Sequence, residues 1–332
     1  MASAASYKVK TQLQQPQPQQ QQQQPPSRWM SWNQREEQDW TNELLVTLGD
    51  THWQRYWAAA VRLVNLSLLV APLVVLAPVS YTGWDKPYWE YCLWGIEQAG
   101  PTFIKFVQWA TTRQDMFSAD FCDKFGKLRD QTRGHAWRET QQILHDRYGP
   151  HYQDTVLQLE PKPIGSGCIA QVYRGTLQQD TGLYPKGTQL AVKVQHPRIL
   201  HKVCVDFYIL GKVASFLESL PYLDLKYLSL RDSVDQFCNI MLPQLDLTLE
   251  AQHLTRFRQD FGSDPQVHFP APLPELTHPN VLVETFCAGK PILTFAAKDD
   301  DSLAIRKALA HLGLQTTLKM IFLHDFVHGD LQ

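Results

Sequence analysis

The sequence predicts an α+β fold, in which a helical N-terminal extension precedes a small β-rich lobe and the start of a second, helical lobe. Two short segments with alternating apolar residues, 169–173 and 189–195, indicate strands. Helical periodicity fills residues 89–130 and returns after residue 245. A final long helix, starting near Ser302, then carries the chain to its last residues.

The composition is that of a mostly globular chain without a strong charge bias. With 332 residues, of which 44% are apolar, the chain can bury a sizeable core and hold about two domains. Its 31 Lys and Arg nearly balance 33 Asp and Glu, so we expect no nucleic acid partner. The six cysteines are scattered singly, which favours reduced thiols.

The N-terminal region divides into two parts. Residues 1–28 are rich in Gln and Pro and too poor in apolar residues to fold, so they are expected to be a disordered tail. The tail has neither the apolar segment of a secretory signal nor a clear mitochondrial transit pattern. Residues 29–88 follow as a separate region that contains one long apolar segment.

That apolar segment, residues 63–79, is a candidate membrane helix. About 17 residues is the lower limit for crossing hydrocarbon, and Arg62 could extend its charge to the interface. Aromatic residues of the kind that lie at membrane interfaces flank it, namely Trp53, Tyr56, Trp57, Tyr81 and Trp84. Against this, Asn65, Pro72 and Pro78 disfavour an ideal helix. A membrane-embedded helix and a buried core helix both remain open.

A helical extension is expected over residues 89–160. Within it, apolar residues recur at the helical spacing i, i+3, i+4 and i+7 at Phe103, Phe106, Val107 and Ala110. Lys105 and Gln108 fall on another face. Periodicity alone predicts an amphipathic helix with a solvated polar side.

A glycine-rich turn comes next, at Gly165, Ser166 and Gly167, and Ala170 lies in the strand that follows it. Glycines let backbone N–H groups approach a phosphate closely, so this turn could cover a nucleotide. It is not a P-loop, because no Gly-Lys-Ser/Thr follows. Taken alone, the Gly-x-Gly pattern is weak, and a plain hairpin turn is the better interpretation.

The strand at residues 189–195 strengthens the nucleotide interpretation. Alternation directs Leu190, Val192 and Val194 to one face, and Ala191 and Lys193 to the other. On that second face the small alanine leaves room for a base, and the lysine can reach phosphate oxygens. A solvated strand lysine is the alternative.

Glu250 provides a third element. In the predicted helix 245–261 it shares the apolar face with Leu254, Phe257 and Phe261. An unpaired carboxylate there is costly, so we expect a cationic partner, for which Lys193 is the candidate.

The remaining elements complete a recognisable order. Residues 278–286 predict a turn and a buried strand, on which Glu284 is expected beside the adenine of a nucleotide. The final helix, with Leu314, Leu318, Ile321 and Phe322 as its expected buried face, leads into His328-Gly329-Asp330. A glycine turn, a strand lysine, an inward glutamate and a His-x-Asp loop follow each other as in protein kinases.

Taken together, these motifs resemble the UbiB/ADCK family of atypical protein-kinase-like proteins, from about residue 100 to residue 332. Six features of the family have counterparts in this sequence. The Lys-x-Gly-Gln motif corresponds to Lys105–Gln108, the glycine or alanine loop to Gly165–Gln171, and the strand lysine with its paired glutamate to Lys193 and Glu250. The Glu-x-Asp motif falls on Gln244–Asp246 and the His-Gly-Asp motif on His328–Asp330. The resemblance implies a protein-kinase-like fold with an N-lobe at 161–290 and a partial C-lobe at 291–332.

The resemblance also implies a function. ATP with Mg²⁺ would be the cofactor, with Lys193 on the phosphates, Glu250 orienting that lysine and Asp330 positioning a hydroxyl or water. Lys105, Gln108 and Asp246 would form a regulatory extension. The implied role is coenzyme Q and lipid metabolism at the mitochondrial inner membrane, with membrane lipid or a lipid-like quinone precursor and mitochondrial proteins as partners.

Three departures from the family pattern qualify this expectation. Val107 replaces a glycine, Gln244 replaces a carboxylate, and the sequence stops at Gln332, before the metal-binding Asn and Asp-Phe-Gly segments. We therefore name no metal ligand and expect a partial chain that is inactive by itself. Two functions stay open: an atypical kinase or ATPase, and a non-catalytic membrane-associated module that binds nucleotide or lipid.

Overall fold

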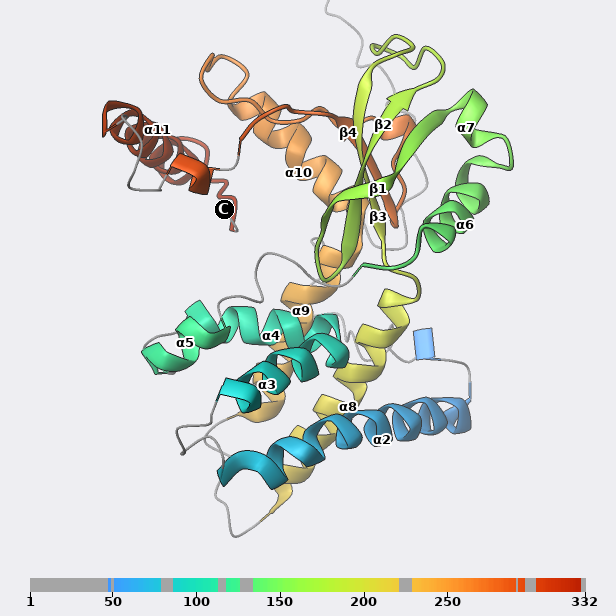
Figure 1. The fold of residues 1–332 in the computed structure, drawn as a ribbon, viewed down its shortest axis with the longest axis vertical. Helices are drawn as coiled ribbons and strands as arrows, with labels where there is room; N and C mark the ends of the chain where they lie inside the picture. The colour runs from blue at the N-terminus through green and yellow to red at the C-terminus, as the bar shows by residue number, and fades with distance from the viewer. Residues whose placement is uncertain are drawn as a thin grey trace, which may run out of the picture. The chain divides into compact units, whose positions relative to one another are not determined.

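The computed structural model describes residues 47–48, 51–78, 86–112, 118–125, 134–220, 229–290, 292–295 and 303–329. All of them belong to one compact unit, Glu37–Gln332. The tail expected to be disordered and Asp330 lie outside the described residues. Helices accompany a single antiparallel sheet in the described part of the chain, which confirms the predicted α+β class (Figure 1).

The sheet has four antiparallel strands in sequential order. They are β1 (Leu157–Ser166), β2 (Ala170–Leu177), β3 (Gln189–Gln195) and β4 (Val281–Thr285). The register of β1 shifts around Pro163, and the segment before β4 adds an edge bridge from Pro272 to Glu284. The strands expected at 189–195 and near 281–286 are thus present.

One face of the sheet is the main core, and the helical extension covers it. Leu190, Val192 and Val194 of β3 are completely buried, as their alternation predicts. Helices α6 (Trp137–Tyr148) and α7 (Tyr152–Thr155) pack on this face through Leu144 and Tyr152 (Figure 1). The sheet is therefore covered on the side that β3 directs away from Lys193.

Helix α10 (Leu247–Asp260) lies against the opposite face of the sheet (Figure 1). Asp246 caps it, because its side chain accepts a hydrogen bond from the Thr248 N–H at 2.9 Å. Leu247 and Ala251 pack on Leu282 of β4. The capped, buried N-terminal turn of α10 fixes where Glu250 emerges.

Helix α11 (Leu303–Phe322) corrects one expectation. The side chains expected to be buried are 42–82% exposed, namely Leu314, Leu318, Ile321 and Phe322. Instead Met320 packs against Phe257 and Phe261, and Lys319 pairs with Asp264 at 2.6 Å. A periodic pattern marks an apolar face but does not say what covers it, so the prediction of the buried face was wrong.

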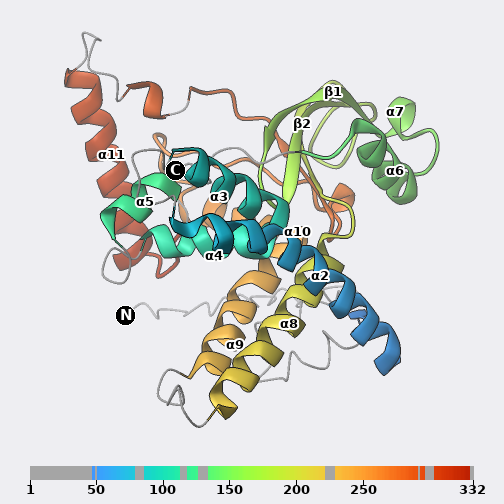
Figure 2. The same ribbon diagram turned by 60° about the horizontal axis from the view of Figure 1, so that its bottom comes forward.

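A group of helices packs together in the rest of the described chain. Figures 1 and 2 show α8 and α9 running side by side, with α2 against α8 and α3 against α4. The helices are α2 (His52–Leu76), α3 (Lys86–Ala99), α4 (Pro101–Thr112), α5 (Ala119–Phe125), α8 (Ile199–Ser219) and α9 (Leu230–Met241).

The buried side of α4 differs from the periodicity expectation. Val107 is buried with Cys92 and Phe125, so its branched side chain fills space among α3, α4 and α5. Ile104 is also buried, at 3% exposure, whereas Phe106 is 45% exposed. The buried stripe is therefore rotated from the predicted one, because neighbouring helices lie on both sides of α4.

Helix α2 is longer than the predicted apolar segment and begins at His52, capped by Thr51. It continues through Pro72 to Leu76. The stretch Trp53–Leu76 is long and apolar enough to cross a membrane, and none of its most apolar window is buried. Leu68, for example, is 68% exposed. In the described part of the chain, α2 is therefore not buried as a core helix, and a membrane span is not demonstrated.

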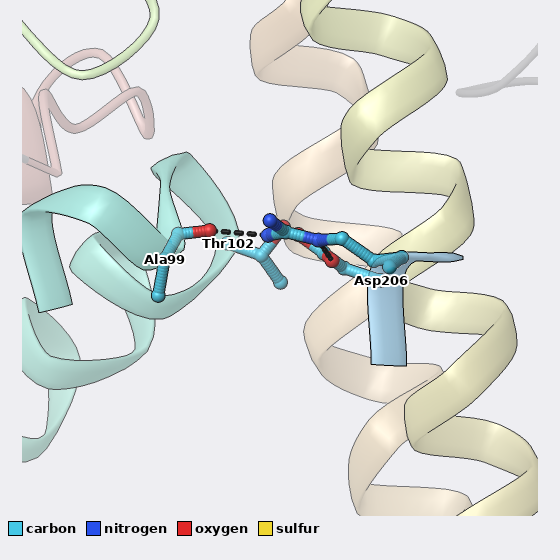
Figure 3. A network of polar contacts seen from close by, with 4 residues as sticks. Ala99, Thr102 and Asp206 are labelled. Atoms are coloured by element: carbon cyan, nitrogen blue, oxygen red, sulfur yellow. Dashed lines mark hydrogen bonds and ion pairs between the residues drawn. The ribbon is translucent and has the colours of Figure 1, made fainter. Parts of the chain in front are cut away.

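A buried ion pair fastens α2 to α8. The Arg62 guanidinium donates to both carboxylate oxygens of Asp206, at 2.6 and 3.0 Å, and to the Ala99 carbonyl. The Thr102 hydroxyl donates to Asp206 Oδ2 at 3.0 Å, so the carboxylate accepts from both Arg62 and Thr102; Figure 3 shows Ala99, Thr102 and Asp206 around this network. The Asp206 side chain is 0% exposed, and burial raises its pKa against the lowering effect of Arg62. The carboxylate depends on its partner to remain charged.

We expect Arg62→Ala to destabilise the protein by about 3 kcal/mol, because it leaves a buried carboxylate unpaired. Urea unfolding followed by tryptophan fluorescence measures this change. The matched control is Lys86→Ala, which removes an exposed pair with Glu90 and should cost less than about 0.5 kcal/mol. Equal costs for the two variants would show that the Arg62–Asp206 pair does not hold α2.

Candidate functional site

The strand register gathers the predicted site residues on one face of the sheet. Gly165, Val172, Lys193 and Leu282 form one row across the four strands. The neighbouring row contains Arg174, Ala191 and Glu284. Residues directly opposite each other in antiparallel strands point to the same face. The glycine turn, the lysine and the glutamate therefore share the face on which α10 lies.

Lys193 and Glu250 form an ion pair. The lysine Nζ donates to both carboxylate oxygens, at 2.8 and 2.7 Å. This confirms the pairing inferred from the cost of an inward carboxylate. The side chains are 29% and 41% exposed, so Glu250 is less buried than its helical face suggested. A pair this exposed contributes little stability, and its main effect is to fix the direction of the ammonium group.

The glycine-rich turn leaves open space and an unpaired polar atom. A Cβ added at Gly165 would meet no atom within 4 Å, so no protein contact requires glycine there. The Oγ of Ser166 is buried and has no hydrogen-bond partner. The turn is closed by the Gly167 N–H, which donates to the Ala170 carbonyl at 2.9 Å. The open space at Gly165, on the Lys193 face, is suited to a phosphate, whereas the Ser166 hydroxyl lies with Gln171 and Val194 on the core face.

Glu284 has an unusual charge environment. Burial raises its pKa to about 7, the negative charge of Glu250 adds to the rise, and Lys193 opposes it. The carboxyl group is therefore part protonated near neutral pH. It lies opposite Ala191 in the register, on the face expected to receive a base.

The residues of the expected regulatory extension lie apart. Lys105 and Gln108 are on α4, which packs on α3, α5 and α8. Asp246 caps α10, and its second carboxylate oxygen, Oδ2, is buried without a hydrogen-bond partner. The described residues show no ion pair between Lys105 and Asp246.

The His-x-Asp segment approaches α10 as far as the structure describes it. The His328 ring lies 5.9 Å from the Phe257 ring, and Phe326 lies 5.5 Å from His253, one turn beyond Glu250. Asp330 lies outside the described residues. Among the residues that are described, no three His, Cys, Asp or Glu side chains gather as metal ligands. The described residues therefore do not by themselves form a Mg²⁺ site.

Sequence analysis overlooked one contact of the turn. The Nε2 atom of His196 lies 2.8 Å from the Gly167 carbonyl oxygen. A histidine directly after the strand that carries Lys193 is the sole local signal, and nothing in its spacing points to the turn.

Comparison with known proteins identifies the class of this fold. A model of the ABC1 atypical kinase-like domain matches residues 127–332, more than half of the chain. The chain therefore belongs to the ABC1 atypical kinase-like family, which includes the proteins named UbiB. The predicted family and the kinase-like fold are both confirmed.

Three relatives place the chain within this family. It is 33% identical to "Probable serine/threonine-protein kinase abkC" of Dictyostelium discoideum, over 82% of this chain and 38% of that protein. Mitochondrial ABC1 family proteins of Schizosaccharomyces pombe and Saccharomyces cerevisiae are 30% and 31% identical, over 84% and 81% of this chain and 44% and 45% of theirs. The chain thus spans less than half the length of these relatives.

One solved structure also aligns with the chain. It is the complex of Rv3197 with erythromycin from Mycobacterium tuberculosis, with a TM-score of 0.49 and 18% sequence identity. The alignment covers 78% of this chain and 61% of that one.

Glu284→Gln should stabilise the protein at alkaline pH. The folded pKa of about 7 lies above the ordinary value of 4.5, so the folded state holds a proton that the unfolded state has lost between these values. Wild-type stability consequently falls as pH rises through this window, by up to about 3 kcal/mol, and glutamine abolishes that loss. Urea unfolding at pH 5 and pH 8 measures the difference.

Glu160→Gln, at an exposed position of β1, is the control and should change stability equally at both pH values. An identical pH dependence in wild type and Glu284→Gln would contradict the buried, proton-holding state of Glu284.

Proposed function

We propose that this chain binds ATP on the sheet face that carries Gly165, Lys193 and Glu284, and that the protein is an atypical kinase or ATPase. The observation that carries the proposal is the Lys193–Glu250 pair, in the same register row as a glycine with open space beside it. Membership of the ABC1 atypical kinase-like family supports it.

Each residue has a physical role in this proposal. Lys193 binds phosphate oxygens, and Glu250 keeps the ammonium group directed toward them. Backbone N–H groups of the turn approach the same phosphates. Ala191 leaves space for the base. Asp330, beyond the described residues, would position the acceptor hydroxyl or a water molecule.

When bound with the nucleotide, Mg²⁺ would neutralise charge on the phosphates. The free oxygen of Asp246 is of the hard type that Mg²⁺ prefers, but the described residues supply no complete ligand set. The proposal therefore rests on the lysine, the glutamate and the turn.

The proposed setting is the mitochondrial inner membrane, with a role in coenzyme Q and lipid metabolism. The mitochondrial ABC1 relatives support the compartment. Membrane lipid or a lipid-like quinone precursor is the proposed acceptor or ligand, and mitochondrial proteins are proposed partners. The balanced net charge of -2 is consistent with the absence of nucleic acid among them.

The second candidate function is a non-catalytic module that binds a membrane and either nucleotide or lipid. The exposure of α2 favours it, because Leu68, Val74 and Val75 are between 68% and 75% exposed on a long apolar helix. Apolar surface of this kind binds lipid when it lies at a membrane. The two functions can coexist in one protein, since α2 and the sheet are separate elements.

We expect Lys193→Ala to weaken binding of MgATP by this chain at least about tenfold, because charged hydrogen bonds to phosphate are lost. Gly165→Ala should weaken it too, with unfolding free energy unchanged, because its methyl group occupies open space. Isothermal titration measures both. Lys162→Ala, at an exposed lysine of β1, is the control. Equal affinity in wild type and Lys193→Ala would contradict the nucleotide site.

The membrane proposal has its own test. Substituting Leu68, Val74 and Val75 together by Gln should reduce flotation with vesicles of phosphatidylcholine and anionic lipid at least about tenfold, because apolar area is lost. Leu183→Gln, at a residue 91% exposed outside α2, is the control. Equal flotation of both variants would exclude α2 as the lipid contact. Alkaline carbonate extraction then separates a spanning helix from a surface-bound one.

A further inference from the structure

The tip of the glycine-rich turn is held by one residue at two points. The backbone N–H of His196 donates to the Ile169 carbonyl at 2.9 Å, and its ring Nε2 lies 2.8 Å from the Gly167 carbonyl oxygen. His196 directly follows β3, three residues after Lys193. The same short segment therefore carries the phosphate-directed lysine and the anchor of the turn.

A chain of polar side chains connects His196 to α6. Nδ1 of His135 lies 2.7 Å from Nδ1 of His196, and its Nε2 lies 2.7 Å from Thr140 Oγ1. Thr140 contacts the Tyr173 hydroxyl at 2.7 Å. The Gln171 amide nitrogen closes the circle, at 2.6 Å from that hydroxyl and 3.2 Å from the His135 carbonyl.

The partners at the two ends determine where each proton lies. A carbonyl oxygen can only accept a hydrogen bond, so neutral His196 carries its proton on Nε2 and its Nδ1 is unprotonated. His135 must then donate from Nδ1, and its bare Nε2 accepts from the Thr140 hydroxyl. Thr140 in turn accepts from Tyr173. This assignment of tautomers follows from the hydrogen-bond network.

Burial and the nearby positive charges both favour the neutral form of the two imidazole rings. Burial, and next the charge of His196, lowers the pKa of His135 to about 4, against the effect of Glu139. The pKa of His196 is also lowered, first by burial and then by Lys202, while its bond to the Gly167 carbonyl and Glu139 oppose the change. A second proton on His196 would set two N–H groups face to face at 2.7 Å.

We propose that His135 and His196 are a neutral pair of complementary tautomers that positions the glycine-rich turn for phosphate binding. The pair acts through the turn and does not itself touch phosphate. This inference rests on the proposed nucleotide function and adds a means by which the N-terminal extension acts on that site, since His135 lies two residues before α6.

A second contact shows that the extension reaches the turn independently of the rings. A Cβ at Gly134 would lie 2.0 Å from Oε1 of Gln171 and 3.3 Å from Oγ of Ser166. The backbone before His135 therefore lies directly over the turn. Gly134→Ala would displace Gln171 and disturb the network from the opposite end.

The test compares His196→Ala with His196→Gln in this chain. Alanine removes the ring contact to the Gly167 carbonyl, whereas the glutamine amide can still donate there and cannot be protonated. Hydrogen exchange of residues 165–171, measured without nucleotide, reports on the turn itself. Affinity for MgATP reports on phosphate binding. His145→Gln is the matched control, because His145 lies on α6 with its side chain 51% exposed.

We expect His196→Ala to increase exchange in the turn and to lower MgATP affinity about fivefold, the effect of losing one net hydrogen bond. His196→Gln and His145→Gln should resemble wild type. Unchanged exchange in His196→Ala would overturn the anchoring role. Faster exchange with wild-type affinity would overturn its link to phosphate binding.

The failure of the proposed nucleotide function has a different signature. If wild type and Lys193→Ala bind MgATP equally, the nucleotide site is wrong, whatever the turn does. The tautomers remain measurable in that case. Nitrogen-15 spectra of labelled histidines at pH 6.5, where a free imidazole is about half protonated, should show His135 with Nδ1–H and His196 with Nε2–H. A protonated ring at either position would contradict the neutral pair.

Gly134→Ala provides a variant that keeps both histidines. It should increase exchange in residues 165–171 in the same direction as His196→Ala, because it displaces Gln171 from Tyr173. Wild-type exchange in a folded Gly134→Ala protein would show that the network does not hold the turn.

Discussion

The pairing register of the four strands is the constraint on which the rest of this structure depends. Side chains alternate between the two faces of a sheet, so a slip of one residue in β3 would move Lys193 into the core under α6 and bring Val192 to the other face. The completely buried row of Leu190, Val192 and Val194 makes such a slip costly. Hydrophobic burial on one face thereby fixes polar chemistry on the other.

Much of the sheet and part of the site could be predicted from sequence, because both depend on short-range patterns. Period-two alternation located β3, and the cost of an inward carboxylate led from Glu250 to Lys193, although 57 residues separate them. The buried face of α11 was predicted wrongly. An apolar stripe tells which residues avoid water, but whether protein, lipid or solvent covers it depends on elements distant in the sequence.

Contacts that close long loops were beyond sequence reasoning for a physical reason. Arg62 and Asp206 are 144 residues apart, and His135 and His196 are 61 apart. Neither pair has a local spacing that points to its partner. Each pair instead provides hydrogen-bond partners for polar groups that folding buries. Which polar groups are buried depends on how the surrounding helices and strands pack, so the sequence alone does not show the pairing.

The attachment of α2 to α8 has a mechanical consequence. Asp206 lies in the second turn of α8, and that helix begins at Ile199, four residues after β3 ends at Gln195. Between them lies His196, the residue that holds the tip of the glycine turn. A displacement of α2 would therefore act, through the Arg62–Asp206 ion pair, on the helix whose first residues adjoin His196. One ion pair and one helix thus join an exposed apolar surface to the residue that holds the glycine-rich turn.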